Sequence, residues 1–318
     1  MEAILKVPYD ATVKVALTSL ERNLLPDAVV RRLTRLLLAS RLRSGYKPSS
    51  ELQLADLLRF ALSLREMPIA IKTDEPKVQH YELPTSFFKL VLGENLKYSC
   101  CYFENKSSSL EDAEKAMLEL YCERAELRDG HTILDVGCGW GSLSLYIAQK
   151  YRNCKVTGIC NSKTQKAHID ERCRELQLEY VEIIVADIST FEMEGSYDRI
   201  FSIEMFEDVN DDDWLTRYFF TGGTMPSANL LLYYQDDVSI VNHWLVNGNH
   251  YAQTSEEWLK RMDKNKASIK PIMESTYGKD SAVKWTVYWR TFFIAVAELF
   301  GYNNGEEWMV SLFLFKKK

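Results

Sequence analysis

Residues 131–151 read HTILDVGCGWGSLSLYIAQKY, and this stretch decides the fold. A short apolar run, TILDVG, is joined to an apolar-periodic run, SLSLYIAQKY, through Gly137, Gly139 and Gly141. This order predicts a buried strand, a tight glycine turn and a helix. In an open parallel sheet, ligands bind at the carboxyl ends of the strands, where a glycine turn lets backbone amides approach them closely. The stretch therefore predicts an α/β protein whose turn either binds a cofactor or serves only as a structural turn.

The neighbouring segments continue the same alternation. Residues 154–160, 181–187 and 197–207 predict three more strands, and residues 142–151 and 162–176 predict the helices between them. Strands separated by helices imply a doubly wound parallel sheet with helices on both faces. Helices are expected before this region, and Ser109 with Asp112 marks the start of the last of them. Residues 237–244 and 309–315 predict two further strands that complete the sheet.

Length, charge and cysteine usage exclude several classes of protein. The chain has 318 residues, of which 46% are hydrophobic, so it can bury a sizeable core. A net charge of -6 favours neither nucleic acid nor anionic membranes. The 7 cysteines lack the paired spacing of zinc sites, and their odd number is typical of a reducing compartment. No run approaches the roughly 18 apolar residues of a membrane span, so we expect a soluble cytoplasmic protein without a metal.

The polar residues at the strand ends indicate the ligand. The glycine spacing is not the G-x-G-x-x-G dinucleotide fingerprint, and Cys160 and Asn161 stand where a nicotinamide cofactor requires an acid. Asp187 ends the third strand, where its carboxylate can receive an exocyclic amine. Asn161 and Gln165 are placed to bind ribose hydroxyls, and Asp135 precedes the glycine turn. The glycine spacing therefore weakens the case for a nicotinamide-dependent oxidoreductase, and these polar residues favour a ligand-binding turn over a purely structural one.

Three motifs then carry a family resemblance. LDVGCGWGSLSLYIAQKY resembles the S-adenosylmethionine motif of class I methyltransferases, in the branch of cyclopropane fatty acid synthases and plant alkaloid N-methyltransferases. Residues 79–103, QHYELPTSFFKLVLGENLKYSCCYF, are similar to the N-terminal signature of that branch. Residues 238–263, together with YNNGEEWM and the terminal FLFKKK, resemble the coclaurine N-methyltransferase family. The resemblance implies a Rossmann-like fold, S-adenosylmethionine as methyl donor and a small secondary amine as acceptor.

The resemblance also implies a division of the chain and a set of cofactor contacts. Residues 1–105 are expected to form a helical extension and lid, residues 106–207 the cofactor-binding core, and residues 208–318 a substrate cap with the final strands. Tyr81 and Ser99 match cofactor-contacting positions of the N-terminal signature, although a packing role for Tyr81 remains open. The other implied contacts, on the strand ends and the turn, are Asp135, Gly137, Gly139, Asn161, Gln165, Asp187 and Ile188.

The catalytic prediction concerns SIEMFED, at the end of the fourth strand. Methyl transfer from a sulfonium is an in-line displacement, so the protein must position the amine, take its proton and stabilise positive charge on nitrogen. Glu204 and Glu207 lie three residues apart there, and carboxylates suit that task. Both match active-site glutamates of the N-methyltransferases. From their spacing alone, a pair of solvated side chains is an equally good interpretation. The next family position is a histidine that acts as general base, but this chain has Asp208.

The family's next helix, its fifth strand and the start of its cap do not appear after Glu207. The gap amounts to a strand-plus-helix unit of about 30 residues or more. A splice variant and a gene-model error would both produce it. We therefore expect an N-methyltransferase of reduced activity. A homodimer is the oligomer that we consider for it.

Two other functions and one structural alternative stay open. The first is a non-catalytic form that binds S-adenosylmethionine and pairs with a full-length partner. The second is a lipid methyltransferase, although Val296 stands where cyclopropane synthases carry a cysteine. Residues 284–293, KWTVYWRTFF, carry aromatic side chains at helical spacing, which form either core or an amine-binding wall.

Overall fold

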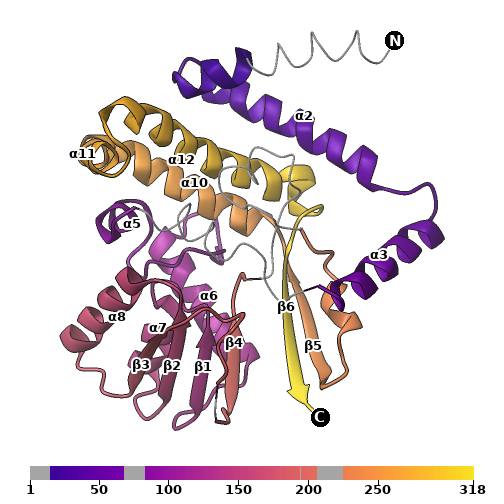
Figure 1. The fold of residues 1–318 in the computed structure, drawn as a ribbon, viewed down its shortest axis with the longest axis vertical. Coiled ribbons are helices and arrows are strands. Elements are labelled where there is room, and N and C mark those ends of the chain that lie inside the picture. Colours follow the sequence, from indigo (N-terminus) through magenta and orange to yellow (C-terminus); the bar gives the residue numbers. More distant parts are fainter. Residues whose placement is uncertain (1–14, 68–82, 194, 206–224) are drawn as a thin grey trace.

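The computed structural model describes residues 15–67, 83–193, 195–205 and 225–318. The chain forms a four-stranded α/β unit, a layer of long helices beside it and a two-stranded ribbon (Figure 1). The carboxyl ends of the four strands point towards the helical layer. A ligand at those ends therefore lies between the two layers.

The α/β unit confirms the predicted parallel sheet. Its strands are β1 (Thr132–Val136), β2 (Lys155–Cys160), β3 (Val181–Val185) and β4 (Arg199–Ser202), and they lie in the order β3-β2-β1-β4. All three pairings are parallel. The connecting helices are α7 (Ser142–Lys150) and α8 (Lys163–Leu176). Buried side chains of β1, such as Ile133, pack with Ile147 of α7, because alternating strands and helices bury their apolar faces on one another.

Helices precede the sheet, as predicted. They are α2 (Asp27–Gly45), α3 (Ser50–Leu64), α5 (Thr85–Val91) and α6 (Leu110–Arg124). The start of α6 is a capping box, in which the Ser109 side chain accepts from the Asp112 backbone while the Asp112 carboxylate accepts from the Ser109 backbone. The predicted start signal at Ser109 and Asp112 is thus confirmed. α6 fixes the position of the loop that precedes it, and that loop enters the site described below.

The helical layer consists of α10 (Asn249–Lys264), α11 (Lys266–Tyr277) and α12 (Lys279–Phe300). The aromatic stripe of α12 belongs to the core, since Tyr288, Trp289 and Phe292 are buried in one apolar cluster. Trp289 also packs on Phe87 of α5, with ring centroids 5.1 Å apart. The core interpretation of residues 284–293 is therefore confirmed for these three rings.

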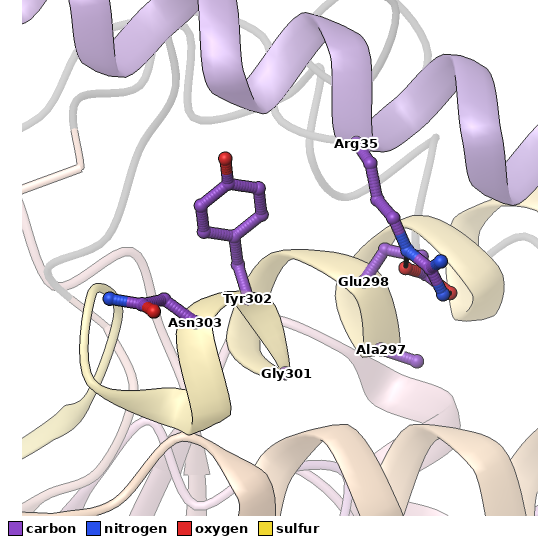
Figure 2. A pocket seen from close by; sticks show the side chains of 6 residues that line it. All are labelled: Arg35, Ala297, Glu298, Gly301, Tyr302 and Asn303. Carbon is purple, nitrogen blue, oxygen red and sulfur yellow. Dashed lines mark hydrogen bonds and ion pairs between the residues drawn. The ribbon is translucent and has the colours of Figure 1, made fainter.

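α2 lies along α12 and is held there by charge. Figure 2 shows Arg35 of α2 reaching Glu298 of α12, and Arg31 donates to the same carboxylate at 2.9 Å. Glu298 is buried, and Arg31 also donates to Glu256 of α10. A buried carboxylate with two guanidinium partners is satisfied, so this cluster fixes the N-terminal extension on the helical layer.

The final strands form where predicted but do not join the sheet. β5 (Val238–Val246) and β6 (Val310–Lys317) pair antiparallel with each other, with an irregularity between Ile240 and Asn242. Within the described residues, β4 pairs only with β1, so the prediction that these strands complete the sheet is wrong there. Val310 of β6 still packs against the apolar cluster that contains Phe201 of β4. The physical reason is that no strand of the described residues lies between β4 and β6 to connect them.

Two single-turn helices complete the described elements. They are η1 (Leu230–Tyr233), before the ribbon, and η2 (Tyr302–Gly305), directly after α12. Within the described residues, no helix combines the length and the apolar character needed to cross a membrane.

Candidate active site

The glycine turn after β1 has the geometry of a ligand cradle. Gly137 has a φ of +76° and Gly139 a φ of +55°, which L side chains adopt only with strain. The backbone N–H groups of Gly137 and Cys138 both donate to the Ile159 carbonyl at 2.9 Å, so the turn lies against the end of β2. A Cβ at Gly139 would meet nothing closer than 4.0 Å, so space is open above the turn.

A cavity of about 90 Å³ lies beside this turn. It brings together six of the predicted residues, which come from the loop before α6, from β1 and its turn, from α8 and from the end of β4. They are Ser99, Asp135, Gly137, Gly139, Gln165 and Glu204. Asp135, Gly137, Gly139 and Glu204 come from the ends of β1 and β4, which meet at one edge of the parallel sheet.

The other predicted residues are placed differently. Asn161 directly follows β2, and Asp187 and Ile188 follow β3, so they lie at the same edge of the sheet but do not line the cavity. All three are half-buried. The Asp187 carboxylate accepts from the Ser189 backbone at 2.9 Å and from its hydroxyl at 2.7 Å. Tyr81 and Glu207 lie outside the described residues.

Asp135 is buried and holds the start of α7. Its carboxylate accepts from the Ser144 hydroxyl at 2.6 Å. Burial raises the pKa of Asp135 to about 6, and the bond from Ser144 acts in the opposite direction. Asp135 therefore orients the helix whose N-terminus faces the cavity.

Gln165 supplies the observation that best tests whether a cofactor fits. Its side chain is buried in the cavity wall, and its Nε2 has no hydrogen-bond partner among the described residues. A buried amide donor without a partner is costly, and a polar ligand in the cavity satisfies it. The open space above Gly139 and this free donor fit the hydroxyl-rich and charged parts of an adenosine cofactor.

Met205 lies against the glycine turn. Its side chain lies over Gly137, where a Cβ would collide with the Met205 sulfur. Ligand pockets of proteins are usually about 300 Å³ or larger. Because methionine is unbranched and has three rotatable bonds, movement of this one side chain enlarges the space at the turn.

Glu204 is the predicted catalytic residue that the structure describes. Its carboxylate accepts from the Cys100 backbone N–H at 2.7 Å and from the Tyr251 hydroxyl at 2.8 Å. Burial raises the pKa of Glu204, while the Lys97 charge and these two bonds lower it. Glu204 also has a φ of +49°, a strained value for a glutamate. The carboxylate is thus held in one orientation at the cavity wall.

Sequence reasoning missed several residues of this site. Lys97 and Trp140 line the cavity and are buried, and Tyr251 reaches Glu204 from α10. Lys97 lies within the KYSC segment of the N-terminal signature, which was the one available signal. Tyr251 and Glu204 are 47 positions apart in the sequence, so no local pattern indicates their contact.

A larger cavity, of about 320 Å³, lies between α2 and the end of α12. Figure 2 shows its lining, with the Tyr302 ring standing apart from the paired Arg35 and Glu298 side chains. It contains none of the predicted site residues. No group of three or more metal-ligating side chains occurs within the described part of the chain.

Comparison with known proteins places this site in a family. The chain is 45% identical to (S)-coclaurine N-methyltransferase of Thalictrum flavum subsp. glaucum, and the match covers 98% of each chain. The chain belongs to the coclaurine N-methyltransferase family. Pavine N-methyltransferase of the same plant is 42% identical over 94% of this chain and 95% of its own length. The model of the mycolic acid cyclopropane synthetase family matches residues 70–216.

Solved structures agree with membership of the coclaurine N-methyltransferase family. A coclaurine N-methyltransferase bound to N-methylheliamine and S-adenosylhomocysteine is 45% identical, with a TM-score of 0.92 over 96% of this chain and 100% of that chain. A mycolic acid cyclopropane synthase shares the fold at 21% identity, with a TM-score of 0.62 over 78% of this chain and 99% of that chain. The predicted Rossmann-like fold and the S-adenosylmethionine-dependent methyltransferase class are confirmed.

Proposed function

We propose that this chain transfers the methyl group of S-adenosylmethionine to the nitrogen of a benzylisoquinoline-type secondary amine. The observation that carries the proposal is the shared cavity, in which the glycine turn and the oriented carboxylate of Glu204 line one space. The names of the relatives support the acceptor class, since they include coclaurine, pavine and tetrahydroprotoberberine N-methyltransferases.

We assign the cofactor contacts by position along the sheet edge. Gly137 and Gly139 leave room for the methionine part of the cofactor, and Ser99 lines the same cavity. Gln165 and Asn161 bind hydroxyls and the methionine part, while Asp187 and Ile188 hold the adenine. Tyr81 completes the set from the N-terminal signature. The cofactor supplies an electrophilic methyl group on a sulfonium.

Glu204 acts on the acceptor. A secondary amine is largely protonated at neutral pH, and a carboxylate both attracts the ammonium form and takes its proton, which frees the nitrogen lone pair. The Cys100 N–H and the Tyr251 hydroxyl each use one lone pair of the Glu204 oxygens, so further lone pairs remain for the amine. We propose Glu207, which the family resemblance implies, as a second catalytic carboxylate.

A missing internal segment also belongs to the proposal. The alignment with the Thalictrum enzyme runs over 352 positions, although this chain has only 318 residues, so the relative contains residues that this chain lacks. β4 and β6 have no partner strand on their facing sides among the described residues. This supports a gap after Glu207 and reduced turnover compared with full-length relatives.

The test combines binding and turnover. Isothermal calorimetry measures binding of S-adenosylhomocysteine, and mass spectrometry measures methylation of a benzylisoquinoline secondary amine, with an unsaturated phospholipid as the competing acceptor. Binding with methylation of the amine is the expected result. Binding without any turnover would instead identify a non-catalytic cofactor-binding form, which the open edge of β4 favours as the second candidate. Methylation of the lipid alone would overturn the amine acceptor.

We further propose a cytoplasmic homodimer. Exposed leucines on two neighbouring helices, α2 and α3, support self-association: Leu33, Leu36, Leu37, Leu52, Leu58 and Leu62. Sedimentation equilibrium tests the dimer, and a monomer at all concentrations would refute it.

A further inference from the structure

Lys97 is a buried lysine at the edge of the candidate active site. Only 1% of its surface is exposed, and it lines the cavity. Its ammonium group donates to the Ser99 hydroxyl and, at 2.5 Å, to the Cys100 carbonyl. The same group lies 5.2 Å from the centre of the Tyr121 ring. Within the described residues, the Lys97 ammonium group therefore donates to two neutral oxygens and to no carboxylate.

The backbone around Lys97 is anchored from α6. The buried carboxylate of Glu114 accepts from the Asn95 backbone at 2.9 Å and from the Lys97 backbone at 3.2 Å. The Lys97 side chain then folds back onto residues 99–100. The loop of residues 95–100 is therefore held at both ends: Glu114 binds its start, and the Lys97 ammonium group binds its end beside the cavity.

The contact between the Lys97 ammonium group and Cys100 connects Lys97 to Glu204. The peptide whose carbonyl Lys97 holds belongs to Cys100, and the N–H of Cys100 donates to Glu204 at 2.7 Å. Ser99, which shares the same ammonium group, lines the cofactor cavity. One side chain therefore contacts both the cofactor side and the acceptor side of the site.

The charges around Glu204 give Lys97 a second effect. Burial raises the pKa of Glu204, and the positive charge of Lys97 is the strongest opposing influence. Burial raises the pKa values of the nearby Cys100 and Cys101 thiols, which are therefore neutral, and Tyr251 donates its proton to the Glu204 carboxylate. The carboxylate of Glu114 lies on the other side of the loop, where it accepts from the Lys97 backbone. Asp135 lines the same cavity and is held by Ser144.

We propose that Lys97 is a positioning residue for methyl transfer, which orients residues 99–100 between the cofactor and Glu204 and keeps Glu204 in its carboxylate form. The proposal rests on the proposed function, in which Glu204 takes the proton of the amine. Without the ammonium group, the pKa of Glu204 rises further, so Glu204 stays protonated to a higher pH and takes the proton of the amine less readily.

The experiment compares Lys97→Met, Lys97→Gln and Lys97→Arg in the full chain saturated with S-adenosylhomocysteine. The direct readout is the titration of the Glu204 carboxyl carbon by 13C NMR, assigned with Glu204→Gln. We expect Lys97→Met and Lys97→Gln to raise the pKa of Glu204 by about one unit or more, as loss of a nearby opposite charge does. Lys97→Arg keeps the charge and restores the parent value. Lys150→Met removes an exposed lysine paired with Glu119 and is the matched control.

The second readout is the pH profile of turnover on the amine. We expect the acid limb of kcat to shift upward with the pKa of Glu204 in Lys97→Met and Lys97→Gln, while turnover recovers at high pH. An unchanged Glu204 titration in Lys97→Met and Lys97→Gln would overturn the proposal. Failure of these two variants to fold, with normal folding of Lys97→Arg, would also overturn it. If the parent chain binds S-adenosylhomocysteine but does not methylate the amine, the proposed function fails, and the NMR titration still decides the role of Lys97.

Discussion

A single added methyl group at Gly137 tests whether the glycine turn is the cofactor site. Gly137 has a φ of +76°, and an alanine there pays the left-handed penalty of about 1–2 kcal/mol. Its Cβ also meets the side chain of Met205, which must move, and enters the space above the turn where we place the cofactor. Gly137→Ala therefore combines a backbone effect with a ligand effect.

Gly130 separates these two effects. It has a φ of +88°, but a Cβ at Gly130 meets nothing within 4 Å, and the residue precedes β1 at the opposite end of the strand. Gly130→Ala pays the same backbone penalty of about 1–2 kcal/mol without entering the cavity. Both variants should lose about 1.5–3 °C in melting temperature, at about 1.5 °C per kcal/mol for a chain of 318 residues.

The assay is calorimetric titration with S-adenosylhomocysteine, with melting curves recorded in parallel. Displacing the ligand by even part of an ångström should weaken binding by about 1.4–2.8 kcal/mol, a factor of ten to a hundred. We expect this loss in Gly137→Ala and parent-like affinity in Gly130→Ala. Equal affinities in both variants would refute the placement of the cofactor over Gly137.

Three further predictions concern side chains of the same edge. The pKa of Asp135, about 6, lies above the usual 3.8, so its proton stabilises the fold fully below pH 3.8 and this stabilisation is lost as pH rises through 6. Asp135→Asn should thus gain up to about 3 kcal/mol at pH 7 in urea unfolding, with no gain near pH 4. Tyr251→Phe removes a bond to Glu204 worth about 1.5–3 kcal/mol, so the acid limb of kcat should move up by about one to two pH units; an unmoved limb would contradict this. Asp187→Ala should weaken S-adenosylhomocysteine binding by about 1–3 kcal/mol in calorimetry, whereas an unchanged Kd would leave Asp187 only its bonds to Ser189.

Local patterns were sufficient for the features that depend on neighbouring residues. The alternation of apolar runs and the glycine spacing predicted the four parallel strands and placed Gly137, Gln165 and Glu204 near one another. These predictions succeed because the carboxyl ends of parallel strands must share an edge. Ser109 and Asp112 likewise reveal a helix start, since a capping box needs only residues three apart.

Features that depend on distant contacts were not predicted. Lys97 is buried because Ser99, Cys100 and Tyr121 surround its ammonium group. The identity of a lysine in the sequence does not show that its side chain is buried. The separation of β5 and β6 from the sheet also depends on non-local pairing. A strand's hydrophobic pattern shows that it pairs but not with which strand, so the ribbon was predicted correctly as two strands and wrongly as part of the sheet.

The two halves of the proposed site are supported unequally by the sheet, and this difference bears on the proposed loss of an internal segment. The glycine turn follows β1, which pairs with a strand on each side, so sheet hydrogen bonds fix the cofactor half. Glu204 follows β4, whose second edge has no partner within the described residues, and its strained backbone is held by bonds from Cys100 and Tyr251. A misplacement of about 1 Å at a reacting group costs about a hundredfold in rate. We therefore expect a weakened β4 to lower turnover on the amine, and we expect the affinity for the cofactor, whose proposed site depends on β1 and β2, to be maintained.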